Sequence, residues 1–263
     1  MLRKYFNLYK TCIANSLSYE AEYRYDTLIK LFTNILWIGM MFITIEVIFS
    51  QTQSIGGWNK GEVYLMTVFW IIADEIFSML FSKNLFGLSD LITDGDLDFY
   101  LTKPVAPLFL VSTRFLNIGG LYRLLIEGGI LGWLLWHFHF PITLPTTLAA
   151  ALLLLLSVVI DYSRVLIGNT FSFWFLRFDN INDVIGALSS VGRYPLSIWP
   201  RTFKIIFLTV LPVAFSGFLP AAAFVGRAAW YLLAYAVVFT IIFFYIAARF
   251  WNFALRHYSS ASS

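Results

Sequence analysis

The sequence predicts an all-α, polytopic integral membrane protein with six transmembrane helices, organised as a single transmembrane domain over residues 1–263. Three observations support this fold class. Hydrophobic residues make up 59% of the chain and charged residues only 13%, whereas soluble domains carry about 25% charged residues. The mean hydropathy is +0.76. Several apolar runs approach the roughly 20 residues with which an α-helix crosses a bilayer.

Residues 1–30 are predicted to form an amphipathic helix that lies in the membrane interface before the first span. Aromatic and aliphatic side chains such as Tyr5, Tyr9 and Leu17 recur at helical spacing among charged ones. We find no apolar core that ends in a small-residue cleavage site, so we expect no cleaved signal peptide. The single cysteine, Cys12, excludes an internal disulfide and a cysteine metal cluster.

The six-span bundle is expected within residues 31–250, with a cytoplasmic tail over 251–263. Its apolar runs are about 31–49, 63–81, 115–136, 147–176, 203–218 and 228–250. The fourth run would be about 45 Å long as a helix, which exceeds the ~30 Å hydrocarbon core, so its end should bend or leave the membrane. The stretch 178–202 carries polar residues and prolines, and we interpret it as an interfacial or re-entrant segment.

The distribution of basic residues predicts that both termini face the cytoplasm. Lysines and arginines gather before the first run, around 83–114, in 177–204 and after the sixth run. The opposite side keeps only Lys60 and Arg227. An excess of basic residues in the loops marks the cytoplasmic side of a membrane protein. Two termini on the same side of the membrane indicate an even number of spans.

Residues 90–104, here called the acidic element, lie between the second and third runs and form the densest group of carboxylates in the chain. Gly95 permits a sharp turn because it lacks a Cβ atom, and aspartates at a helix start can cap free amides. Leu97 and Leu101, four residues apart, would share one face of a short helix. Pro104 disfavours helical geometry at the residue before it, which ends the helix. An ordinary polar loop helix and a helix that presses on a partner both fit this pattern.

Charged residues inside the predicted spans need a partner or a wet cavity, because each costs at least ~2.5–3.5 kcal/mol at the centre of the bilayer. They are Asp74 and Glu75 in the second run, Arg123 and Glu127 in the third, and Asp161 and Arg164 in the fourth. Similar depths predict an ion pair between Arg123 and the acids of the second run. These charges can line a translocation path or relay protons, but we favour structural pairing between and along helices.

Two stretches together resemble a family of type-2 ABC-transporter permeases. Residues 94–104 are similar to that family's cytoplasmic pattern G-(D/E)-L-D-x-x-L-x-(K/R)-P. Residues 193–200, with the proline-containing stretches 211–215 and 219–221, resemble the segment before and within the family's fifth span. The order, spacing and hydropathy of these parts match over nearly the whole chain.

The resemblance implies a transport subunit rather than an enzyme, which pairs with a second permease and exports its substrate across a bacterial cytoplasmic (inner) membrane. ATP and Mg²⁺ would be bound by a separate dimer of ABC ATPase subunits, because we find no nucleotide site in this sequence. The acidic element would be the coupling helix. The residues that the resemblance assigns to ATPase coupling are Asp94, Gly95, Asp96, Leu97, Asp98, Leu101, Lys103 and Pro104.

An ion- or proton-coupled secondary carrier is the alternative function, and its site would be the intramembrane charges. A membrane-embedded enzyme would need a catalytic constellation, and the sequence contains none that we recognise. The other expected partner is membrane lipid. No nucleic acid partner is expected, because the net charge of +3 is small. The resemblance assigns no role to Asp74 and Glu75.

Overall fold

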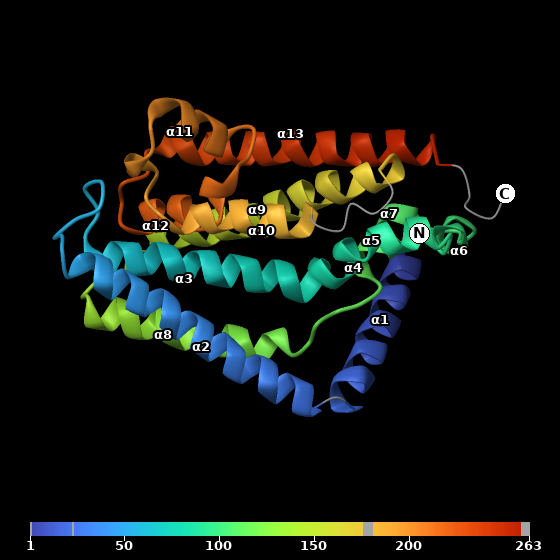
Figure 1. The fold of residues 1–263 in the computed structure, drawn as a ribbon, viewed down its shortest axis with the longest axis horizontal. Helices are drawn as coiled ribbons and strands as arrows, with labels where there is room; N and C mark the ends of the chain where they lie inside the picture. The colour runs from blue at the N-terminus through green and yellow to red at the C-terminus, as the bar shows by residue number, and fades with distance from the viewer. Residues whose placement is uncertain (1, 23, 176–180, 259–263) are drawn as a thin grey trace.

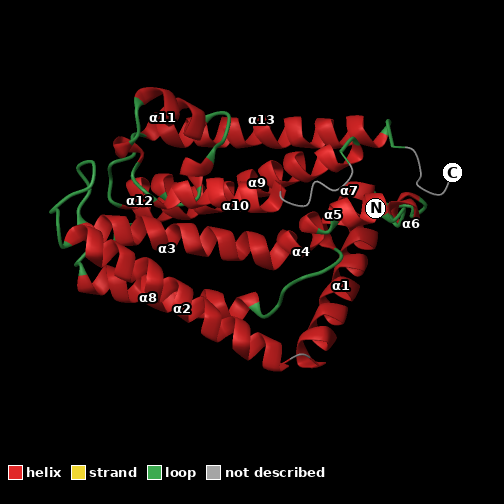
Figure 2. Cartoon of the chain, viewed as in Figure 1, coloured by secondary structure: helices red, strands yellow, loops and turns green. Residues whose placement is uncertain are grey.

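The structure, a computed structural model, describes residues 2–22, 24–175 and 181–258. Within these residues the chain is helical, and its β-type pairing is limited to an isolated bridge between Ile55 and Trp58. Long helices run side by side along the longest axis of the molecule, and shorter helices gather at both ends (Figure 1). Figure 2 shows the same arrangement as helices joined by loops. The predicted all-α fold class is confirmed.

The described helices are of two kinds: long helices that form the bundle, and groups of short helices between them. The α-helices are α1 (Leu2–Glu22), α2 (Arg24–Phe49), α3 (Lys60–Phe77), α4 (Lys83–Phe86), α5 (Leu88–Thr93), α6 (Leu97–Leu101), α7 (Pro107–Thr113), α8 (Gly120–His137), α9 (Leu144–Thr170), α10 (Ile181–Ser189), α11 (Arg201–Leu208), α12 (Phe218–Phe224) and α13 (Trp230–Leu255). The π-helical segment η1 (Ser78–Ser82) continues α3, and the 3-10 segments are η2 (Phe171–Phe173), η3 (Ser190–Arg193), η4 (Leu196–Ile198) and η5 (Val213–Phe215).

One end of the bundle, here called the terminal end, holds the start of α1 and the end of α13, together with α5, α6 and α7 (Figure 1). The opposite end holds the loop between α2 and α3 and the loop between α12 and α13. Helix α1 lies across the long axis at the terminal end. The acidic element therefore lies at the same end as the start of α1 and the end of α13.

Helices α9 and α3 form the centre of the bundle. Helix α9 packs against α13, α12 and α3, and α3 packs against α8. One buried cluster, which includes Leu65, Met66 and Leu134, fills the half near the opposite end. A second cluster, which includes Leu85 and Trp251, fills the half near the terminal end. These contacts hold the acidic element against the centre of the molecule.

The start of α3 is fixed by a capping box. The Asn59 side chain accepts a hydrogen bond from the Glu62 backbone N–H at 3.0 Å, and the Glu62 carboxylate accepts one from the Asn59 N–H at 2.8 Å. This reciprocal arrangement satisfies two amides that a helix start leaves unpaired. Arg227, in the loop before α13, reaches Glu62 at 2.7 Å. The cap therefore also joins two loops of the opposite end.

Fewer helices than the six expected meet the length and composition of a membrane span. In the described residues four helices are long and apolar enough to cross a membrane: Tyr25–Phe49, Lys60–Thr93, Leu144–Phe173 and Trp230–Leu255. A bent helix pair, Arg201–Leu208 and Val213–Phe224, would make a fifth. Helix α8 has 18 residues, and Arg123 and Glu127 within it lower its hydropathy. Six spans are therefore not confirmed.

The predicted fifth span, over about 203–218, is not one continuous helix. The chain breaks between α11 and α12 and turns by 79°. Pro212 lies at this break, where it supplies no backbone N–H to continue the helix. Helix α10, within the stretch predicted to be interfacial or re-entrant, packs along α9 (Figure 1) and buries Ile185 and Ser189. Residues 178–180 of that stretch lie outside the described residues.

Candidate functional site

The acidic element forms a compact protrusion at the terminal end and contains most of α5, the turn at Gly95 and α6 (Figure 1). Gly95 makes its turn with φ of +78°, a backbone conformation that glycine adopts without the strain of a side chain. The short helix α6 follows and ends at Leu101, before Lys103 and Pro104. The predicted turn, helix and helix end are confirmed.

The capping by aspartate that the sequence predicts is absent at the start of α6. Asp96 has helical backbone angles, φ −66° and ψ −17°, and its side chain makes no capping hydrogen bond. A capping residue needs an extended backbone so that its side chain can reach the free amides. The turn at Gly95 leads the chain into the helix with Asp96 already helical. Its carboxylate is therefore left on the exposed surface.

Leu97 and Leu101 do not share one exposed face, so this prediction is also wrong. Leu97 is fully buried in the cluster around Leu85 and Trp251, whereas Leu101 is 36% exposed. Phe99, between them, is 60% exposed. Leu97 therefore attaches the element to the protein, and Phe99 and Leu101 form its accessible apolar surface.

Polar contacts attach the element at two further points. The Tyr100 hydroxyl accepts a hydrogen bond of 2.7 Å from the Arg114 guanidinium, which also lies over the Tyr100 ring. Tyr258, which follows the end of α13 in the chain, faces Asp98. Burial and this neighbouring carboxylate raise the pKa of the Tyr258 hydroxyl. On the exposed side, the Lys103 ammonium lies 3.7 Å from the centre of the Phe99 ring. The element is therefore fixed on its inner side and open on its outer side.

Helix α3 leads almost without interruption into the acidic element. From Lys60 to Thr93 the chain is helical over 34 residues, through α3, the π segment η1, α4 and α5. A helix of this length spans about 51 Å, more than the hydrocarbon core. Asn84 ties this rod to the chain before α8, because its amide donates to the Phe115 carbonyl at 2.7 Å and accepts from the Phe115 N–H at 3.0 Å.

Glu75 on α3 and Arg123 on α8 form the buried ion pair that the sequence predicts. The guanidinium donates two hydrogen bonds, from Nε to Oε2 at 2.8 Å and from Nη2 to Oε1 at 2.7 Å. Gly120 leaves room for this carboxylate, because a Cβ atom there would lie 2.6 Å from Oε1. Such two-point pairs fix both distance and orientation. This pair therefore joins α3 to α8.

Asp161 and Arg164 form the second predicted pair, along α9. Arg164 Nη2 donates to Asp161 Oδ1 at 2.6 Å, and both side chains are buried. The Ser216 hydroxyl donates to the other oxygen of Asp161 at 3.0 Å. Arg164 keeps Nε and Nη1 buried without a hydrogen-bond partner. This cluster joins α9 to the break between α11 and α12.

The two remaining predicted residues differ from these pairs. Asp74 is exposed on α3, where Asp161 and Arg164 are near enough for their charges to act on it. Glu127 is buried on α8, and its closest hydrogen-bond contact is the Asn34 amide at 3.5 Å. Its second oxygen has no partner. The intramembrane charges therefore include two strong pairs, one exposed carboxylate and one weakly bound carboxylate.

Sequence reasoning missed three residues that organise these sites. Ser216 binds Asp161, Asn84 binds the backbone of Phe115, and Tyr258 faces Asp98. Each contact joins segments far apart in the sequence, and a single serine, asparagine or tyrosine gives no local signal of such a partner. The proline-containing stretch around Ser216 was the only available indication of a backbone break there.

The comparison with protein families gives one match across most of this arrangement. Residues 35–262 match the family described as ABC-2 family transporter protein. The chain belongs to the ABC-2 transporter family. The comparison with curated proteins found no match.

Membership in the ABC-2 family identifies the chain as a multi-pass membrane permease of an ABC transporter. ABC-2 permeases associate in general with an ABC ATPase partner. The resemblance based on the acidic element and residues 193–200 is therefore confirmed at the level of the family.

Proposed function

We propose that this ABC-2 permease is the transmembrane subunit of an ATP-driven exporter and that its acidic element is the coupling helix. In this proposal the outer surface of α6 docks into a groove of a separate ATPase subunit, which binds ATP and Mg²⁺. The terminal end faces the cytoplasm of a bacterium. The observation that carries the proposal is the exposure of Phe99 and Leu101 on an element whose inner side is fixed by Leu97.

The chemistry of the exposed surface supports a protein partner. Phe99 and Leu101 are apolar and lie on a short helix that is followed by Lys103, while Asp94 and Asp96 are exposed before its start. Apolar anchors surrounded by charge are typical of the centres of protein interfaces, where single aromatic residues often supply much of the binding free energy. A groove that is apolar in the middle and basic near the aspartates would complement this surface.

The helical rod supports transmission of force from this surface into the bundle. A displacement of α6 acts on α5, and α5 continues through α4 and η1 into α3. The ion pair between Glu75 and Arg123 passes the displacement to α8. In the proposed cycle, closure of the ATPase subunits moves α3 and α8 together and rearranges the contact with a second permease.

Substitution of the exposed residues tests docking without unfolding the element. Phe99→Asp and Leu101→Asp place charge on the apolar surface, and we expect loss of the ATPase that co-purifies with the wild-type chain in mild detergent. Removing one interface anchor costs about 1–4 kcal/mol, or roughly fivefold or more in affinity. The matched control is Ile142→Asp, an exposed apolar residue in the loop between α8 and α9, which should leave co-purification unchanged.

The docking proposal is wrong if both variants retain the ATPase and transport normally, or if the wild-type chain transports without a nucleotide. A proton-coupled carrier is the second candidate, favoured by the exposed carboxylate of Asp74 on a membrane helix. Transport that stops with an uncoupler, continues without ATP and is lost in Asp74→Asn would support the carrier.

A further inference from the structure

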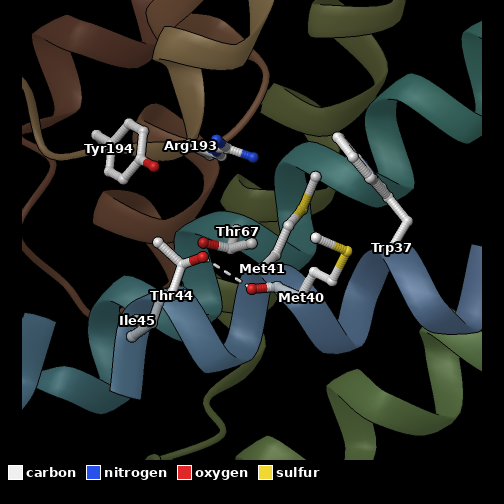
Figure 3. A pocket seen from close by; sticks show the side chains of 8 residues that line it. All are labelled: Trp37, Met40, Met41, Thr44, Ile45, Thr67, Arg193 and Tyr194. Atoms are coloured by element: carbon white, nitrogen blue, oxygen red, sulfur yellow. Dashed lines mark hydrogen bonds between the residues drawn. The ribbon is translucent and has the colours of Figure 1, made fainter. Parts of the chain in front are cut away.

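A small cavity lies between α2, α3 and the 3-10 segment η3, away from the acidic element (Figure 3). It has a volume of about 130 Å³. Its lining residues are Trp37, Met40, Met41, Thr44, Ile45, Thr67, Arg193 and Tyr194. Cavities that enclose a whole drug-sized ligand measure about 300–1,000 Å³, so this one accommodates only part of a molecule.

Arg193 is the cation of this cavity and lacks an acidic partner. In Figure 3 its guanidinium points from η3 toward the space above α2. Its Nε is buried without a hydrogen-bond partner, and among the described residues no carboxylate forms an ion pair with it. The guanidinium carbon lies over the rings of Trp70 and Tyr194, 5.8 and 5.0 Å from the ring centres. A cation in a membrane-spanning bundle needs a counter-charge or water.

The backbone around Arg193 is held in place by two glycines. A Cβ atom at Gly217 would lie 2.6 Å from the Met66 carbonyl oxygen and 2.7 Å from that of Gly192. A Cβ atom at Gly192 would collide with the Val213 carbonyl. The Trp70 indole also donates a hydrogen bond of 2.9 Å to the Ser189 carbonyl at the end of α10. The guanidinium is therefore presented from a closely packed segment.

The rest of the lining is apolar in practice. The hydroxyls of Thr44 and Thr67 donate to carbonyls of their own helices, Met40 at 2.8 Å and Val63 at 3.0 Å. The side chains of Met40, Met41 and Ile45 supply hydrocarbon and thioether surface. Arg193, the Tyr194 hydroxyl and the Trp37 indole N–H remain as donors for a ligand. An anion bound here would therefore lie beside hydrocarbon rather than in a polar cage.

The position of the cavity fits a molecule that resides in the membrane. Along α2, Thr44 and Trp37 lie about 7 and 18 Å from the helix end at Phe49, given a rise of 1.5 Å per residue. Trp37 is 57% exposed and Met40 is 62% exposed, on the outer face of α2. The opening therefore continues onto surface that lipid chains can cover.

We propose that this cavity binds the anionic head group of a membrane amphiphile, with Arg193 as its counter-charge. The Tyr194 hydroxyl donates a second hydrogen bond to the head group, and the hydrocarbon part lies along Trp37 and Met40. Phosphate esters and carboxylates match the planar, forked guanidinium. This site is independent of the proposed docking of an ATPase, because it concerns binding to the permease alone.

Brominated lipids test the site, since bromine quenches nearby tryptophan. The full chain is placed in nanodiscs of phosphatidylcholine that contain a small fraction of brominated phosphatidylglycerol or, in the parallel sample, brominated phosphatidylcholine. The difference between wild type and Trp37→Phe isolates the signal of Trp37. We expect phosphatidylglycerol to quench Trp37 more strongly than phosphatidylcholine does. Arg193→Gln should weaken this preference about tenfold, and Arg193→Lys should keep most of it.

Two further variants separate binding from folding. Tyr194→Phe removes one hydroxyl and should weaken the preference less than Arg193→Gln does. Arg249→Gln is the matched control, because Arg249 also lies over an aromatic ring, that of Tyr245 at 5.8 Å, but on α13. It should leave Trp37 quenching unchanged.

Several results would overturn the proposal. Equal quenching of Trp37 by both lipids, or an unchanged preference in Arg193→Gln, would remove the head-group site. Displacement of the lipid by inorganic phosphate at low concentration would indicate a site for a free anion. If Arg193→Gln and Asp74→Asn abolish self-association equally without changing lipid preference, the counter-charge is a carboxylate of a second copy.

Discussion

Arg123 donates two hydrogen bonds to Glu75, at 2.8 and 2.7 Å, and so joins α8 to α3 at a buried position. Helix α3 continues from Glu75 through the π segment to the acidic element. The helical segment that carries Glu75 therefore connects the buried pair to the exposed protrusion that follows Thr93.

Breaking this pair should destabilise the protein strongly. Arg123→Met leaves the Glu75 carboxylate buried without its partner, and loss of one member of a buried pair costs about 3–5 kcal/mol. Gly120→Ala should weaken the same pair, because the added Cβ would lie 2.6 Å from the Glu75 oxygen. Thermal unfolding of the purified permease in detergent measures both effects.

The control for this prediction is Lys60→Met. Lys60 and Glu46 form an exposed pair at 3.2 Å, and exposed pairs contribute about 0–1 kcal/mol. If Arg123→Met lowers stability no more than Lys60→Met does, the buried pair does not hold α3 and α8 together.

Truncation of Leu97 should lower the stability of the protein far more than truncation of Leu101, although the two residues are only four positions apart. Leu97 is fully buried, so Leu97→Ala removes core packing and should cost about 2–5 kcal/mol. Leu101→Ala should stay within about 0.5 kcal/mol, because Leu101 lies at the surface. Limited proteolysis near residues 93–96, together with thermal unfolding, measures the difference. Equal losses in the two variants would contradict the inward position of Leu97.

Ser216→Ala should loosen the segment between α11 and α12. The variant removes the hydrogen bond to the buried Asp161 carboxylate, and a bond to a charged group contributes about 1.5–3 kcal/mol. Ser157→Ala on α9 is the control, because the Ser157 hydroxyl donates only to the Leu154 carbonyl of its own helix. Hydrogen exchange of residues 209–217 should rise in the first variant and remain unchanged in the second.

Cys12 should react slowly with maleimide at neutral pH. Burial raises the pKa of the Cys12 thiol, which lowers the fraction of reactive thiolate relative to an exposed cysteine. The rate should increase as the pH rises and should reach that of a free thiol when the chain is unfolded. Alkylation followed by mass spectrometry measures it, since Cys12 is the single cysteine of the sequence. A rate equal to that of free cysteine at neutral pH would contradict the effect of burial.

The same cysteine reports the orientation of α1. If the terminal end faces the cytoplasm, a membrane-impermeant maleimide should leave Cys12 unlabelled in intact cells and label it in inverted vesicles. A cysteine introduced at Ile142 should show the reverse pattern in a Cys12→Ser background, because the loop between α8 and α9 packs beside the start of α3 through Phe138 and Tyr64. Labelling of Cys12 in intact cells would place the acidic element outside the cell.

The sequence contained the information for the helices, the charged pairs and the turn of the acidic element. Apolar length predicts α2, α9 and α13, and the cost of unpaired charge in lipid predicts that Arg123 needs an acidic partner. A glycine among aspartates predicts the turn at Gly95. These features depend on local composition or on energies large enough to leave few alternatives.

The features that escaped prediction depend on tertiary packing. Leu97 and Leu101 have the same spacing and chemistry, and only the position of the cluster around Trp251 decides which is buried. The break at Pro212 was visible in the sequence, but its angle is set by contacts with α9 and α3. The cavity beside Arg193 lies between α2 and η3, which are about 150 residues apart in the chain. The local sequence pattern of neither segment predicts this contact.

The π segment at Ser78–Ser82 has a consequence for comparing relatives of this protein. A π turn contains one residue more than an α turn, so it can absorb a one-residue insertion without unwinding the helix. Alignments of ABC-2 permeases with this chain should therefore show single-residue gaps between Phe77 and Lys83. Loss of that residue would rotate everything beyond it by about 100° and turn Phe99 toward a different neighbour.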